Sequence, residues 1–113
     1  MVIGILPDAE ATESLLNNLS EAEFDLAGVS VLMRDAKQRA AIAEDAGPLK
    51  GVQVSDLASR LAQTGLAARD VGPYCDAVNQ GKVLVAIAGP KAAEPAASEM
   101  LQDHRAQLIR GLP

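Results

Sequence analysis

Apolar runs alternate with amphipathic stretches along this chain, and their order predicts a domain that mixes strands and helices. Val2–Leu6 is a continuous apolar run that ends at Pro7, which predicts a buried strand. Asp8 then suits the N-cap of a helix, and Glu10 places negative charge in its first turn. One face of that helix is apolar and consists of Ala11, Leu15, Leu16 and Leu19.

The middle of the chain predicts a second strand followed by helices. Val29 and Val31 alternate with Ser30, so a strand is expected to start near Val29. Residues 36–46 favour a weakly amphipathic helix that Gly47 and Pro48 end. Residues 49–54 hold two glycine-flanked polar turns and give no clear pattern. A helix opening at residues 55–56 and stopping at Gly65 is expected to face inward with Leu57, Ala58, Leu61 and Ala62.

The last third of the chain predicts a helix, a strand and another helix. Residues 66–80 read as a helix, with Gly72 and Pro73 as a first-turn position from which the helix proper starts. Residues 83–88 are continuously apolar, which predicts a central buried strand. Residues 92–104 predict a helix with Ala93, Ala97, Met100 and Leu101 inward. The segment Leu108 and Ile109 fits either a short closing strand or a continuation of that helix.

The two ends of the chain repeat one pattern, because each has an apolar strand, a proline and then a helix rich in Ala and Glu. Two such strand–helix–strand units in one sheet form the split βαβ, or ferredoxin-like, arrangement. We therefore expect a single α+β domain over residues 1–113, with an antiparallel sheet, helices on one face and extra central helices. Right-handed crossovers put both long helices on the same face. The central helices or a second copy of the chain could cover the other face.

Residues 74–87 resemble the bacterial general stress protein family, whose members carry a heat-induced, YflT-like domain. In that family a helix bearing a tyrosine, here Tyr74, leads through a glycine, here Gly81, into an apolar strand like Val83-Leu84-Val85. The short first strand and the helix after it also match. Members often carry a long apolar hairpin in the middle, whereas residues 47–51 here form a short polar stretch. The resemblance implies a stress-associated role and brings no reaction, ligand or catalytic residue.

Composition narrows the range of partners and locations. Hydrophobic residues make up 49% of the chain and aromatic residues 2%, so the core is built from aliphatic side chains that offer few stacking surfaces to bases. A formal net charge of −5 disfavours binding to nucleic acid or to an anionic membrane. One cysteine excludes an internal disulfide. The N-terminus lacks a signal-peptide pattern, so a cytoplasmic location is expected.

Few side chains stand out as candidates for chemistry. Tyr74 could line a pocket or an interface, and Cys75 could be reactive if Gly72 and Pro73 set it near a helix N-terminus. In each case a packing role is the competing interpretation. His104, the one histidine, has no partner at metal-ligand spacing and suits a helix C-cap. The acidic residues near position 8 suit a helix start. We expect no catalytic residue, metal or cofactor.

Three classes of function follow, in decreasing order of support. The first is a non-enzymatic stress-associated or protein-interaction domain that acts as a homodimer, because the resemblance and the uncovered sheet face favour it. The second is a small-molecule sensor with its ligand at the subunit interface, by analogy with other ferredoxin-like modules. The third is an enzyme, which would need converging polar groups that the sequence does not offer.

Overall fold

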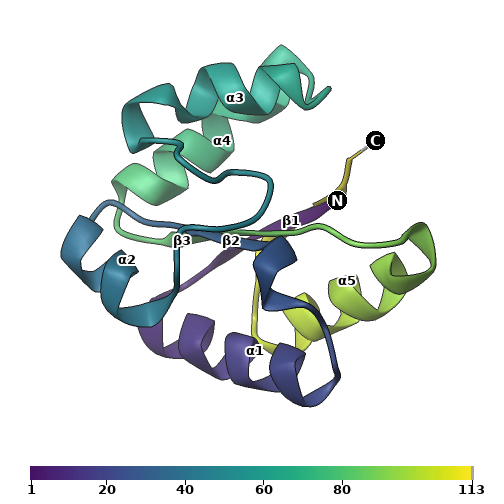
Figure 1. The fold of residues 1–113 in the computed structure, drawn as a ribbon. Coiled ribbons are helices and arrows are strands. Elements are labelled where there is room, and N and C mark those ends of the chain that lie inside the picture. Colours follow the sequence, from purple (N-terminus) through teal and green to yellow (C-terminus); the bar gives the residue numbers. More distant parts are fainter. Residues whose placement is uncertain (113) are drawn as a thin grey trace.

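Four strands form one antiparallel sheet in the order β2-β3-β1-β4 in the computed structural model, which describes residues 1–112 (Figure 1). The strands are β1 (Val2–Leu6), β2 (Val29–Leu32), β3 (Val83–Ile87) and β4 (Gln107–Gly111). The α-helices are α1 (Ala9–Glu21), α2 (Ala36–Ile42), α3 (Leu57–Gln63), α4 (Ala68–Asn79) and α5 (Glu94–Asp103). Short 3-10 helices are η1 (Leu26–Gly28), η2 (Val54–Asp56) and η3 (Lys91–Ala93).

The strand order confirms the split βαβ prediction. The units β1-α1-β2 and β3-α5-β4 interleave in the sheet, so β1 and β3 lie in the centre and β2 and β4 at the edges. Residues 83–87 are the central strand that their unbroken apolar run predicts. The α+β class and the ferredoxin-like topology therefore follow from the chain's own pattern.

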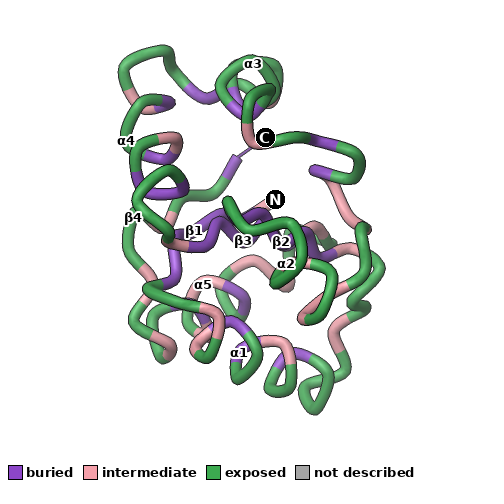
Figure 2. The backbone as a smooth tube through the Cα atoms, turned by 90° about the vertical axis from the view of Figure 1, so that its left-hand side faces the viewer, coloured by how far each residue is buried: buried purple, intermediate pink, exposed green. Residues whose placement is uncertain are grey.

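Helices cover both faces of the sheet. The long crossover helices α1 and α5 pack on one face together with the short α2, and α3 and α4 pack on the other (Figure 1). The strands β1, β2 and β3 are buried between these layers, as Figure 2 shows, whereas β4 is largely exposed. The sequence left open whether the central helices or a second copy of the chain covers the second face. The helices α3 and α4 cover it.

Burial from both sides explains why the strands read as apolar runs rather than as alternating patterns. In β1, Ile3 and Ile5 join the core under α3 and α4, whereas Val2 and Leu6 join the core under α1 and α5. Gly4 faces the core under α1 and α5, because a Cβ atom there would come within 3.3 Å of Leu101 on α5. The sheet is thus the common wall of two aliphatic cores.

Three details of the sequence prediction are corrected, and one open alternative is decided. The helix expected over residues 36–46 ends at Ile42, because Ala43 already has an extended backbone. The fourth helix begins at Ala68, so Pro73 lies inside it rather than in its first turn. On α3 the buried side chains are Leu57 and Leu61, whereas both alanines expected beside them are exposed. Of the two alternatives left open for Leu108 and Ile109, the short closing strand is confirmed.

Within residues 1–112, no helix has the length and apolar character needed to cross a membrane.

Candidate functional site

Tyr74, a side chain singled out from the sequence, lies in the core and holds the edge strand β4. Its side chain is 2% exposed, and its hydroxyl donates to the carbonyl oxygen of Leu108 at 2.5 Å. Burial raises the pKa of Tyr74 above its ordinary value, and Asp70 adds to this while Arg110 opposes it. Tyr74 is therefore positioned to fix the backbone of β4 against α4.

The strand that Tyr74 holds carries a bulge. Ile3 pairs with Arg110 and Ile5 with Gln107, so two residues of β4 stand opposite Gly4. Leu108 in this bulge has a φ of 53°, a left-handed conformation that costs a leucine about 1 to 2 kcal/mol. Besides the tyrosine hydroxyl, an ion pair ties β4 to α4, because Nη1 of Arg110 lies 2.7 Å from Oδ2 of Asp70.

The outer edge of β4 is open in the part of the chain that the structure describes. The strand has β1 as its one neighbour, and four of its five residues are exposed. Met1 and Leu112 exchange backbone hydrogen bonds of 3.3 and 2.7 Å across the β1–β4 pair. Because direction alternates along an antiparallel strand, Arg110 also faces β1, whereas the N–H and C=O groups of Ile109 and Gly111 face away from it.

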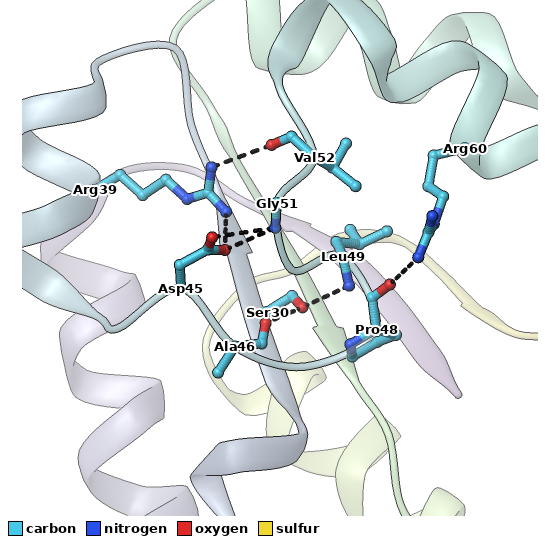
Figure 3. A network of polar contacts seen from close by, with 9 residues as sticks. All are labelled: Ser30, Arg39, Asp45, Ala46, Pro48, Leu49, Gly51, Val52 and Arg60. Atoms are coloured by element: carbon cyan, nitrogen blue, oxygen red, sulfur yellow. Dashed lines mark hydrogen bonds and ion pairs between the residues drawn. The ribbon is translucent and has the colours of Figure 1, made fainter.

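The opposite edge of the sheet, at β2, is sealed by the connection between α2 and η2 (Figure 3). Ser30 in β2 is fully buried, and its hydroxyl donates to the carbonyl oxygen of Ala46 at 2.5 Å. The hydroxyl oxygen of Ser30 also accepts the N–H of Leu49 at 2.8 Å. One serine therefore joins two points of the connection to the edge strand, and Leu49 fills the core beside it.

Charged side chains hold this connection in shape. Oδ1 of Asp45 accepts from Nη2 of Arg39 at 3.1 Å, and the Asp45 carboxylate also accepts the N–H of Gly51 at 3.1 and 3.2 Å. Arg39 donates through Nη1 to the carbonyl oxygen of Val52 at 3.3 Å (Figure 3). Arg60 on α3 donates to the carbonyl oxygen of Pro48 at 3.2 Å. Residues 43–53 are thus an organised cover of the β2 edge.

Gly47 lets this cover approach β2 closely. Its φ is +77°, and a Cβ atom there would lie 2.6 Å from Oγ of Ser30 and 2.8 Å from the Ser30 nitrogen. The cover therefore lies against the backbone of β2, where a side chain would not fit. An edge strand shielded in this way offers no template for pairing with another chain.

Cys75, the second side chain singled out, is half-buried in the middle of α4. Because α4 begins at Ala68, the expected position near a helix N-terminus is wrong, and the positive end of the helix dipole is distant. Burial, and to a smaller extent the nearby Asp76, raises the pKa of the Cys75 thiol. This environment disfavours the thiolate, which is the nucleophilic form.

His104 is the C-cap of α5 and joins it to α1. Nδ1 lies 2.7 Å from the carbonyl oxygen of Met100, so this nitrogen carries the proton. Nε2 is then an acceptor for the side-chain amide of Asn18 at 2.9 Å. Asp8 is the N-cap of α1 and accepts the N–H of Ala11 at 2.8 Å, as predicted. Among residues 1–112, no group of three or more His, Cys, Asp or Glu side chains could hold a metal ion.

The sequence reading missed the role of Ser30. Its signal was a hydroxyl between two valines in a strand that is buried on both faces, where a polar side chain needs an internal partner. The open β4 edge was also missed, because the sequence left open whether Leu108 and Ile109 form a strand. Tyr74 and Cys75 remain predictions as site residues, and the structure adds that Tyr74 contacts the backbone of the open edge strand.

The chain matches no protein-family model, and neither a curated protein nor a solved structure is significantly similar to it. The resemblance to the general stress protein family therefore stays a prediction.

Proposed function

We propose that this chain is a non-enzymatic protein-interaction domain that acts as a homodimer, joined through the β4 edges of two copies. The observation that carries the proposal is the contrast between the two sheet edges. The β2 edge is sealed by Ser30 and residues 43–53, whereas β4 is exposed and bordered by β1 alone among the described residues. The resemblance to general stress proteins supports a stress-associated role in the cytoplasm.

The backbone of β4 can pair with itself. Two antiparallel copies related by a twofold axis at Arg110 bring Ile109 opposite the partner's Gly111, and Gly111 opposite the partner's Ile109. Both residues point their backbone groups away from β1, so each pair can exchange two N–H···O bonds. The result is a continuous sheet across both copies, an arrangement in which each copy uses the same surface.

The charges near the axis allow this approach. In the proposed register each Arg110 faces the partner's Arg110, and like charges directly opposite one another destabilise a strand pair. Asp70 lies 2.7 Å from Arg110 within the same chain, so each guanidinium reaches the axis already paired with a carboxylate. The four charges sum to zero, so the two copies approach without net repulsion at the axis.

The interface differs from the one that the sequence analysis suggested. An uncovered sheet face was the original reason to expect a dimer, and α3 and α4 occupy that face. Tyr74 keeps a part in the proposal, because it sets the position of β4 through the Leu108 carbonyl.

Gly111 offers a matched pair of variants to test the proposal. A Cβ atom at this position would lie 3.7 Å from Oε1 of Glu94, an ordinary contact, so Gly111→Ala keeps the backbone donor without strain. Gly111→Pro removes an N–H that points away from β1, which an edge strand tolerates. We expect wild type and Gly111→Ala to sediment as dimers and Gly111→Pro as a monomer with an unchanged circular dichroism spectrum. A wild-type monomer, or a dimeric proline variant, would contradict the proposal.

A further inference from the structure

A hollow of about 480 Å³ lies near the β2 edge, on the face of the sheet that α1 and α2 cover. It lies between α1, η1, the start of β2 and the end of α2. Its size falls in the range of small-molecule sites, which span roughly 300 to 1,000 Å³. The hollow is formed within one chain. Because β2 and β4 are opposite edges of the sheet, it is independent of the proposed dimer interface.

The walls of the hollow are largely apolar. Leu16 of α1, Val29 of β2 and Ile42 of α2 line it, and all three belong to or pack against the core under α1 and α5. Leu26 of η1 also lines it and is 40% exposed, as one of two large apolar side chains left exposed among residues 1–112. An apolar ligand body would bury this leucine, which water contacts in the free chain.

The polar groups around the hollow favour a positive charge. Glu44 is the one charged residue that lines it, and the side chains of Asn17 and Ser20 add oxygen acceptors. The helix α2 ends at Ile42, next to Glu44, so the last carbonyl groups of α2 bring a partial negative charge to the same place. Arg39, the basic residue of that last turn, is engaged by Asp45 and the Val52 carbonyl.

The wall formed by α2 can adjust to a ligand. This helix has no fully buried residue, and its hold on the rest of the chain comes from the partly buried Ile42 and from the contacts of Arg39 with Asp45 and Val52. Elements with few buried apolar contacts open at low cost.

We infer that this hollow binds a small organic cation: a molecule with an apolar body that lies on Leu16, Val29 and Ile42, and with an ammonium group that pairs with Glu44. The apolar walls supply affinity without selectivity, and the carboxylate with the end of α2 selects for positive charge.

Three probes of equal chain length test the inference by NMR titration of the labelled protein: n-hexylammonium, hexanol and hexanoate. We expect hexylammonium to shift the backbone amide signals of Ser20 and Ala43 with a Kd of about 1 to 10 mM, the range for so small a ligand. Hexanol binds more weakly, and hexanoate binds more weakly still because Glu44 repels it.

Variants separate the charge from the apolar site. Glu44→Gln weakens hexylammonium binding about twofold to fivefold, the usual weight of an exposed ion pair, and leaves hexanol binding as it was. Glu99→Gln, on the exposed side of α5, is the matched control and has no effect. Ser20→Leu fills the hollow from an exposed helix position and abolishes binding of both probes. Equal shifts by hexylammonium and hexanoate, or unchanged binding in Glu44→Gln, would overturn the inference, as would shifts that spare Ser20 and Ala43.

Discussion

Two glycines with the same backbone conformation test whether residues 43–53 are seated on β2. Gly47 and Gly51 both have a φ of +77°, a conformation that costs an alanine about 1 to 2 kcal/mol. A Cβ atom at Gly51 would meet nothing within 4 Å. A Cβ atom at Gly47 would lie 2.6 to 2.8 Å from atoms of Ser30 and Val29, two of which belong to the backbone and cannot rotate away.

The two alanine variants should therefore differ widely in stability. Gly51→Ala should lower the unfolding free energy by about 1 to 2 kcal/mol, because the backbone conformation is its only cost. Gly47→Ala adds the displacement of the connection from β2, which breaks both hydrogen bonds of the Ser30 hydroxyl. The buried N–H of Leu49 is then unpaired at a cost of about 1 to 3 kcal/mol, so the total loss is about 2 to 5 kcal/mol.

Urea unfolding of the wild type and both variants measures the difference, with the transition midpoint and its slope fitted separately. We expect Gly47→Ala to be less stable than Gly51→Ala by about 2 kcal/mol, with similar slopes. Equal losses in the two variants would refute the reasoning, because they would mean that the connection does not lie against the β2 backbone.

Three further predictions concern the helix ends and the two side chains singled out from the sequence. Glu23 and Arg105 follow the C-caps of α1 and α5 and have a φ of 64°, a conformation that favours glycine. Glu23→Gly and Arg105→Gly should therefore each raise the unfolding free energy by about 0.5 to 1 kcal/mol. A loss of stability in either variant would argue against these caps. Burial raises the pKa of the Cys75 thiol, so iodoacetamide at pH 7 to 8 should label it more slowly than N-acetylcysteine, and equal or faster labelling would count against the site as described. Tyr74→Phe should cost about 1 kcal/mol at neutral pH by losing the bond to the Leu108 carbonyl. Because the pKa of Tyr74 is raised in the fold, the unfolded chain ionises first as the pH rises past 10.0, so wild-type stability should fall there more steeply than that of Tyr74→Phe; parallel pH profiles would contradict this.

The fold was predictable because local and global signals agree along most of the chain. Residues 2–6 and 83–87 are apolar without interruption, and the structure buries them on both faces as adjacent central strands. The ends of α1 also follow from local chemistry, since Asp8 caps its start and the apolar stripe reaches Leu19. Strand order then follows from the repeated strand–helix pattern.

The parts that sequence reasoning missed depend on distant neighbours. Pro73 lies inside α4 because burial of Tyr74 and Val78 against the sheet favours a continuous helix, and this outweighs the missing donor. Residues 43–53 have no periodic pattern, because side chains rather than a backbone ladder organise them. Ser30 acquires its partners across 16 and 19 positions of the chain. The open edge at β4 was missed because this mostly exposed strand has no apolar run of its own, and its pairing with β1 is what defines it.

Amide hydrogen exchange at Ile109 and Gly111, followed by NMR over a wide range of protein concentration, tests the central claim most directly. If two copies pair through β4, these two N–H groups become hydrogen-bonded in the dimer, and their exchange slows as concentration rises. The N–H of Arg110, which faces β1, is the internal reference and changes far less. Exchange at Ile109 and Gly111 that is fast and independent of concentration would contradict a homodimer built on this edge.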